Sequence, residues 1–419
     1  MDEKFSSSNK NKFLKMLYFL GRFSWIPIVV LPILTCLKTS YALVEKSLGR
    51  IDVQATIEGV YDSNMFSSYT EESDFLVKFI PIAQYAKRLG PLQVSAALGG
   101  SFGRYFDHGE EDFSDPITRF SFGMAEDFGI FSVDKRSAGK VQFGFDTDIS
   151  QRTETNEQLQ DLISYTLYSA DFSVRYNHSP KFGVSTNINY GFRDYKNFSG
   201  REESYQNIED VNAGITAYYI YSPKLDFYLG HTFSIIDSPE PSNFIKGSVN
   251  HTMFGIDGDI TPKLTGNVQL GYATRSYDNS DLAAEDSMLF DVQLMWAWRE
   301  KTKLSLNFMR EFDPSPQDQG MLTTTFGTQV TQRFSKRVAG TLGAYYGTVD
   351  FSSYREFGPF FERSDRTDKR YGISLTVLAH LTSYLDGRFG YNYTNITSGL
   401  GDEFNNERHL LSIGLIVQY

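Results

Sequence analysis

The sequence predicts an all-β fold: a transmembrane, antiparallel, up-and-down β-barrel of about 18 strands (roughly 16 to 18), preceded by a signal peptide. Three observations lead to this prediction. Segments of about ten residues alternate between apolar and polar side chains. Short turns alternate with longer polar connections. No stretch after residue 45 approaches the ~20 continuous apolar residues that a membrane-spanning helix needs.

The segment 264–277 shows the alternation most clearly, because Val268 and Leu270 share one face while Asn267 and Gln269 share the other. The rival class is a large soluble β-protein. Such a fold would carry many charges on its polar face, whereas Gly, Ser, Thr and Asn dominate that face here. Small polar groups suit a wet lumen and large apolar ones suit lipid, so the pattern favours a membrane barrel.

Prolines mark the turns between strands. Pro180, Pro223 and Pro262 recur about every 40 residues, which is the length of one hairpin with its connections, and each is followed by Lys. A hairpin is therefore the repeating unit. Pro81 falls inside the segment 74–86, where we expect an edge strand or a β-bulge.

Nine hairpins account for the chain from residue 50 onward. An even strand number returns both ends of the barrel to the same side, which we expect to be the periplasm. The longest expected connection is 351–368, and no segment remains that is long enough to form a plug. The expected strands are 50–61, 74–86, 92–106, 117–133, 141–152, 162–176, 182–195, 205–221, 225–236, 247–260, 264–277, 286–298, 304–312, 321–334, 338–349, 369–381, 384–395 and 408–419.

The N-terminal residues predict export. Five cations precede the apolar run 25–37, and Ser40 and Ala42 are small residues at the positions that a signal peptidase reads. We expect a signal peptide at 1–42, a short periplasmic segment at 43–49 and the barrel at 50–419. The alternative is a single anchoring helix, which Pro27 and Pro32 disfavour. The one cysteine, at position 36, lies within this leader.

The final strand and the net charge limit the kinds of binding partner that we expect. Leu411, Ile413, Leu415, Val417 and Tyr419 share one face, and this ending resembles the C-terminal signal that the barrel-assembly machinery recognises. Outer-membrane lipid and lipopolysaccharide are the other expected partners. The formal charge of −11 excludes a general nucleic-acid-binding protein, which needs a strongly basic surface.

A family resemblance lies in residues 57–85. The runs IEGVYDSNMFSS and SDFLVKFIPIAQY are similar to the opening hairpin of the putative β-barrel porins of the second type, which are outer-membrane proteins often linked with exopolysaccharide production. The resemblance implies a barrel of about 18 strands and the passage or secretion of polysaccharide, and it supplies no catalytic residues. The residues that carry it are Gly59, Tyr61, Asp62, Ser63, Asn64, Asp74 and Pro81.

Charged residues on the polar face are the candidate pore-lining set. They could form cross-strand ion pairs that brace a wide barrel, or opposed charges that orient a polar solute. Six arginines against nine aspartates predict a mild preference for cations. The set comprises Arg175, Arg193, Arg275, Arg333, Arg370 and Arg388 with Asp146, Asp148, Asp171, Asp210, Asp226, Asp257, Asp259, Asp291 and Asp386.

The sequence carries no pattern that indicates catalysis. Its six histidines are scattered, no metalloprotease, phosphate-loop or nucleophile-elbow motif occurs, and we expect no enzyme activity, cofactor or metal site. His251 and His380 fall on the polar face, whereas His231 falls on the apolar face. Either His231 lies near the membrane interface, or the expected register of its strand is wrong by one residue. We therefore expect an outer-membrane channel for polar solutes, the alternative being a non-conducting structural or surface-interaction barrel.

Overall fold

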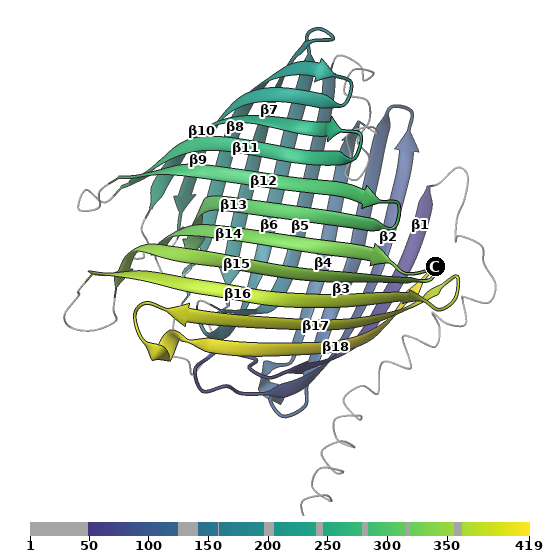
Figure 1. Ribbon diagram of the computed structural model, residues 1–419, viewed down its shortest axis with the longest axis vertical. Helices are drawn as coiled ribbons and strands as arrows, with labels where there is room; N and C mark the ends of the chain where they lie inside the picture. Colours follow the sequence, from purple (N-terminus) through teal and green to yellow (C-terminus); the bar gives the residue numbers. More distant parts are fainter. Residues whose placement is uncertain are drawn as a thin grey trace, which may run out of the picture.

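The structure is a closed antiparallel barrel of 18 strands (Figure 1). This computed structural model describes residues 49–124, 141–157, 159–196, 205–239, 246–278, 284–315, 319–355 and 363–419. The strands are β1 (Arg50–Asp62), β2 (Asp74–Leu89), β3 (Leu92–Tyr105), β4 (Phe113–Met124), β5 (Val141–Asn156), β6 (Asp161–Asn177), β7 (Phe182–Tyr195), β8 (Ile208–Ser222), β9 (Leu225–Asp237), β10 (Gly247–Thr261), β11 (Leu264–Tyr277), β12 (Glu285–Arg299), β13 (Thr302–Ser315), β14 (Gln319–Arg333), β15 (Val338–Arg355), β16 (Arg363–His380), β17 (Leu385–Ser398) and β18 (Asn406–Gln418). Two short 3-10 helices, η1 (Gly109–Glu111) and η2 (Asp402–Phe404), lie in connections.

The barrel closes between its first and last strands. Gln54 pairs with Gln418, and Val53 and Tyr419 exchange two backbone hydrogen bonds of 2.9 Å. In Figure 1 the strands β12 to β18 in front cross β1 to β6 behind, as tilted strands of a barrel do. The predicted fold class and strand number are confirmed. The expected signal peptide lies outside the described residues.

Several strand boundaries differ from the expected ones. β4 begins at Phe113 and ends at Met124, and residues 125–133 of the expected strand lie outside the described residues. β8 begins at Ile208, three residues after the expected start. The expected connection 351–368 is largely strand, because β15 continues to Arg355 and β16 begins at Arg363. The extensions of β15 and β16 lack the alternation of apolar and polar residues, so the sequence pattern did not indicate a strand there.

Pro81 lies in the middle of β2, and the expectation of an edge strand or bulge is wrong. A closed barrel has no edge. The register between β2 and β3 is the same on both sides of Pro81, with Phe79 opposite Phe102 and Ile82 opposite Gly99. The ladder merely skips the proline and its neighbour, because proline has no N–H to donate.

The two faces of the wall have the composition that the alternation predicts. Leu270 is 46% exposed and lies between Phe254 and Phe290 of the adjacent strands, so this face points outward to lipid. On the inner face, Ala273 of the same strand and Asp226 of β9 are fully buried. His231 is on the outer face, where its Nδ1 lies 2.9 Å from the Thr252 hydroxyl. Its register was therefore correct.

Hydroxyl groups organise the short turns. Ser179, Thr261 and Ser335 each accept a hydrogen bond of 3.0 Å from the amide three residues ahead. A Ser or Thr that caps the turn in this way, followed by a residue with fixed φ such as Pro, stabilises a tight reversal. The Ser/Thr-Pro-Lys repeat of the sequence is thus a turn signal with a direct structural cause.

Candidate functional site

The inner face of β9 to β11 carries a hydrogen-bonded polar patch. The hydroxyl of Tyr228 donates to the side-chain oxygen of Gln269 at 3.0 Å and lies 3.0 Å from the Asn267 amide nitrogen. It reaches them across Gly255, where a Cβ atom would lie 2.4 Å from that hydroxyl. Glycine at this position therefore lets a large polar side chain lie flat along the wall, and the wall stays smooth and hydrogen-bonded.

Many of the predicted lining residues are ion-paired. Arg175 contacts Asp226 at 3.0 Å and packs over the Tyr218 ring at 4.3 Å. In the described residues, four of the nine aspartates pair with an arginine or a lysine and a fifth pairs with a histidine, so a count of charges alone overstates the negative field in the lumen. The pairs are Arg175–Asp226 (3.0 Å), Arg193–Asp210 (3.6 Å), Asp148 with Arg119 and Arg152 (3.3 Å each), Lys224–Asp259 (3.2 Å) and His380–Asp386 (2.7 Å).

Other members of the predicted set have different neighbours. Asp171 accepts a hydrogen bond of 2.6 Å from Asn189, and Asp146 lies opposite it in the ladder. Asp291 accepts from Gln293 at 3.1 Å, and Asp257 lies opposite Asp226. Within the described residues, Arg333 and Arg388 make no ion pair. The set therefore contains ion pairs that brace the wall and carboxylates that accept hydrogen bonds from neighbouring side chains.

The end of the β5–β6 hairpin folds inward across the lumen. β5 pairs with β4 only as far as Ser150, although it continues to Asn156 with β6. Beyond that point the hydroxyl of Thr155 donates to the Met65 carbonyl at 2.7 Å and accepts from Arg408 at 3.0 Å. These partners belong to β18 and to the β1–β2 connection, several strands away from β5 around the barrel. The tip also lines a cavity with Asp368 and Arg370 of β16, still farther around the wall, so the hairpin end crosses the mouth of the barrel.

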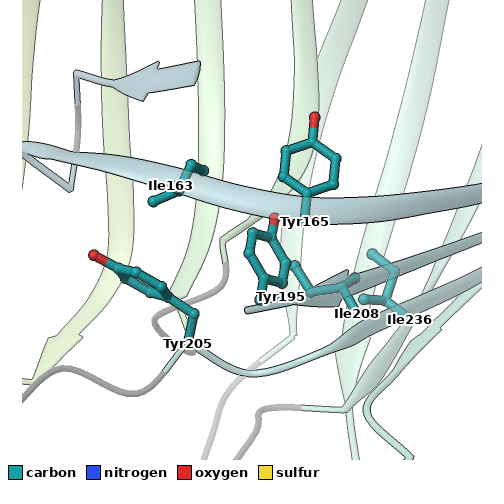
Figure 2. Close-up of a cluster of buried hydrophobic side chains, with 6 residues drawn as sticks. All are labelled: Ile163, Tyr165, Tyr195, Tyr205, Ile208 and Ile236. Carbon is teal, nitrogen blue, oxygen red and sulfur yellow. The ribbon is translucent and has the colours of Figure 1, made fainter. Parts of the chain in front are cut away.

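Apolar packing holds this hairpin end in place. Figure 2 shows Ile163 and Tyr165, on the inward end of β6, beside Tyr195, Ile208 and Ile236. Tyr165 and Tyr195 lie 5.2 Å apart, centroid to centroid. The tip is anchored by polar contacts as well, since Tyr205 donates to Asp161 at 2.8 Å. The hairpin end is therefore a packed part of the lumen.

A second hairpin, β13–β14, also bends inward. The ladder between β12 and β13 stops at Phe290 and Arg310 on the loop side. Above it, Phe312 and Leu322, which have the parity of the outer face, pack against the inner-face cluster of Val249, Ala273 and Leu289. The outer face of the hairpin can meet the inner face of β10 to β12 only if the hairpin has folded into the lumen.

The second hairpin carries a carboxylate, Asp313, which interacts electrostatically with arginines of other strands. The charges of Arg193, Arg275 and Arg370, from β7, β11 and β16, all act on Asp313 of β13. Arg275 is only 4% exposed, packs over the rings of Tyr277 and Phe312, and leaves its buried Nη1 without a hydrogen-bond partner. Strands from distant parts of the barrel thus place charges of both signs at one constriction.

Cavities flank the two hairpins. One of about 350 Å³ lies beside β13 and is lined by polar groups from β7 to β13, including Arg193, Asn212, Gln269, Asp291 and Glu311. A second, of about 230 Å³, lies between the β5–β6 tip and the wall formed by β15 to β17. Cavities of this volume, lined by amides, hydroxyls and charges, can hold a small polar solute.

The tip of β5–β6 carries a carboxylate into the second cavity. Glu157 lies in the turn beyond β5, and burial raises its pKa, although the charges of Arg370 and Arg408 and a hydrogen bond with Thr394 act against this rise. Glu157, Asp313 and Glu311 were not among the residues that the sequence predicted to line the pore. Glu157 lies in a turn, where the alternation of a strand does not indicate which way a side chain points. Asp313 and Glu311 lie on β13, and its inward bend could not be predicted from the residue pattern.

The residues of the family resemblance build the loop-side end of the closing seam. Asp62 pairs with Arg408 through two contacts of 3.0 and 2.6 Å, and the buried Asn64 donates to the carbonyls of Ser68 and Glu407. Asp74 accepts from the amides of Asp107 (3.1 Å) and His108 (2.8 Å). These contacts fix the β1–β2 and β3–β4 connections, which places Met65 under the inward hairpin.

The histidines do not assemble a hydrolytic site in the described residues. His380 pairs with Asp386, and the buried Nε2 of His251 has no hydrogen-bond partner. No group of three or more His, Cys, Asp and Glu residues in the described ranges is arranged to hold a metal ion.

Comparisons with known proteins agree with this architecture. A family model described as "Putative beta-barrel porin 2" matches residues 51–419. No curated protein matches. Solved structures that resemble the chain include OpdK of Pseudomonas aeruginosa (10% identity, 88% of this chain and 99% of that chain, TM-score 0.48), OccK3 (OpdO) of P. aeruginosa (9%, 88% and 95%, 0.46) and a BenF-like porin of Pseudomonas fluorescens Pf-5 (9%, 88% and 99%, 0.48).

Proposed function

Because the chain belongs to the Putative beta-barrel porin 2 family, and is thus a porin-like barrel of the outer membrane, we propose that it passes small polar solutes, short saccharides among them. The observation that carries the proposal is the hydrogen-bonded polar lining of the lumen. It extends beyond the hairpins, since a further cavity of about 380 Å³ is lined by Arg175, Ser185, Asn187, Thr216 and Tyr218.

The two inward hairpins set the size of the solute. They fill part of the lumen on the loop side with the clusters around Ile163 and Phe312. A saccharide of one or two units can pass if its hydroxyl groups form successive hydrogen bonds with the amide and Tyr–OH groups of the lining. The passage of an exopolysaccharide chain, which the family resemblance implies, would require the hairpins to move aside.

Swelling of proteoliposomes in iso-osmotic sugars tests the proposal. We expect fast swelling in a monosaccharide, slower swelling in a disaccharide and almost none in a tetrasaccharide, with protein-free vesicles as the control. The packed hairpins also favour a second candidate, a barrel that does not conduct. Vesicles that contain folded protein and swell in none of the sugars would establish that candidate instead.

We also propose a role for the C-terminal strand in the assembly of the barrel. The outward residues Leu415, Val417 and Tyr419 would engage the assembly machinery before β18 pairs with β1. Tyr419→Ala should then lower the amount of folded protein in outer membranes while the purified variant still folds in detergent. Equal amounts of wild type and variant in the membrane would refute this role.

A further inference from the structure

A histidine lies in the middle of the lipid-facing wall. His231 is the central residue of the 13-residue strand β9, and its neighbours along the outer face, Leu229 and Phe233, are 58% and 40% exposed. Ile215 of β8, which lies opposite His231 in the ladder, is also exposed. His231 therefore lies within the apolar band, where a barrel ordinarily presents large aliphatic and aromatic side chains to lipid.

The hydrogen-bonding capacity of this imidazole is only partly used. Its Nδ1 lies 2.9 Å from the hydroxyl of Thr252, which is opposite His231 on β10. Within the described residues its Nε2 has no hydrogen-bond partner, and whichever ring nitrogen carries the proton, Nε2 keeps an unused donor or acceptor. Asn250, the next outward residue of β10 toward the loops, is exposed, and its side chain makes no hydrogen bond in the part of the chain that the structure describes.

Lipid cannot satisfy these groups. Hydrocarbon tails offer neither donors nor acceptors, and the apolar residues on both sides of His231 separate it from water and headgroups. An unsatisfied polar group on this face is costly. The arrangement therefore fits an occupant that is itself embedded in the membrane and brings polar groups to the same depth. A second copy of the chain does so, because its own His231 and Thr252 lie at that depth.

The residues around this pair favour close contact between two walls. Ala213 and Ala217 of β8 are exposed and flank Ile215 on the outer face. Small side chains let two membrane-embedded surfaces approach closely enough for hydrogen bonds to form between them. Several strands away around the barrel, β15 and β16 present Leu342 and Ile373, which are large, apolar and exposed, as a surface that meets lipid should be.

We propose that the outer face of β8 to β10 joins two copies of this chain about a two-fold axis, with His231 and Thr252 of each copy facing those of the other. In such a contact a patch meets itself, so the polar groups of one copy meet donors and acceptors on its mate. In a ring of three or more copies, the patch would meet a different sector of the wall, such as that of Leu342, and would stay unpaired. The inference concerns assembly and is independent of the proposed channel function.

Cross-linking through single cysteines in native outer membranes tests the proposal. The one natural cysteine is removed by Cys36→Ser, and a thiol is supplied at the proposed contact by Ile215→Cys or away from it by Leu342→Cys. A short bifunctional maleimide should join the Ile215→Cys protein into dimers and leave the Leu342→Cys protein, the matched control, as single chains. Native mass spectrometry of the purified wild type should give the mass of two chains.

His231→Leu tests the part that the polar pair plays. Leucine suits the lipid face, so this variant should fold normally, which its heat-modifiable mobility on gels checks. Added to Ile215→Cys, it should lower the yield of cross-linked dimer about tenfold, since hydrogen bonds between the two copies are lost.

Several results would overturn the proposal. Equal cross-linking at positions 215 and 342 would mean random collision, and no cross-linking at either would mean that the copies stay apart. A product of Ile215→Cys with a different protein would identify another partner. A mass of one or of three chains would exclude the two-fold pair, and an unchanged dimer yield in His231→Leu would show that the polar groups do not hold the copies together.

Discussion

At the residue scale, the direction of a side chain follows from strand parity. Leu270 and Gln269 are neighbours in β11, yet one faces lipid between two phenylalanines and the other accepts a hydrogen bond from Tyr228 in the lumen. The sequence alone predicted this division. It could not predict which polar residues meet, because partners such as Tyr228 and Gln269 lie on strands that are not adjacent.

The first prediction tests the faces. Leu270→Arg should lower the free energy of barrel unfolding by about 2 to 4 kcal/mol, since a charge on the lipid face near mid-membrane is poorly solvated. Gln269→Arg should cost only about 0.5 to 1.5 kcal/mol, the value of one neutral hydrogen bond, because residue 269 faces water. Urea unfolding in lipid vesicles measures both. Equal losses would mean that the faces are misassigned.

The second prediction concerns pH and the β3–β4 connection. Burial alone would lower the pKa of His108, but hydrogen bonds and charge interactions with Asp74 and Glu72 outweigh it and raise the pKa above its ordinary value. The contact therefore stabilises the loop fully below about pH 6.5, and this stabilisation is lost as the pH rises through the raised pKa.

Hydrogen exchange at the amides of Phe106, Asp107 and His108, which donate to Asp74, reports this change. Protection factors should fall as the pH rises, and His108→Gln should remove that pH dependence while Asp74 keeps its amide contacts. A dependence that persists unchanged in His108→Gln would show that another group is responsible.

At the element scale, hairpins were predictable and their bending was not. The alternation in 141–176 is the same whether the hairpin stays in the wall or folds inward. Its inward course depends on the hydrogen bond from Thr155 to Met65 and on the packing of Leu162 in a cluster with residues of β1 to β4, and both join distant segments. The loss of pairing between β4 and β5 above Ser150 likewise leaves no local signature.

The third prediction concerns the seam that anchors this hairpin. Asp62 and Arg408 form a largely buried ion pair between β1 and β18. Asp62→Ala should lower the free energy of unfolding by about 3 to 5 kcal/mol, because it leaves the arginine uncompensated. The matched control is Asp52→Ala, which breaks the exposed pair with Arg50 and should cost less than about 1 kcal/mol. A similar, small loss in both variants would show that the seam pair is dispensable.

At the scale of the whole molecule, composition, turn spacing and strand number predicted a closed barrel, and the structure has it. The expectation that no segment fills the lumen was incomplete, because strand ends took the place of a plug. The predicted mild preference for cations stays a prediction. Ion pairs such as Arg175–Asp226 and Arg193–Asp210 neutralise part of the counted charge, so the ratio of aspartates to arginines alone does not give the strength of that preference.

The central claim is that the lumen is a conducting path narrowed by the β5–β6 hairpin. Gln151 and Thr166 are opposite one another in that hairpin, so residues 152–165 can be replaced by Asn-Gly, a two-residue turn that keeps the register of the wall. Most of the pairing with β4 and β7 is retained.

Single-channel conductance of the wild type and this shortened variant, measured in planar bilayers, tests the claim most directly. We expect small, discrete openings for the wild type and a conductance several times larger for the variant, because the inward hairpin end is gone. Equal conductance in both proteins would show that the hairpin does not limit the path, and the absence of current in both would contradict the channel itself.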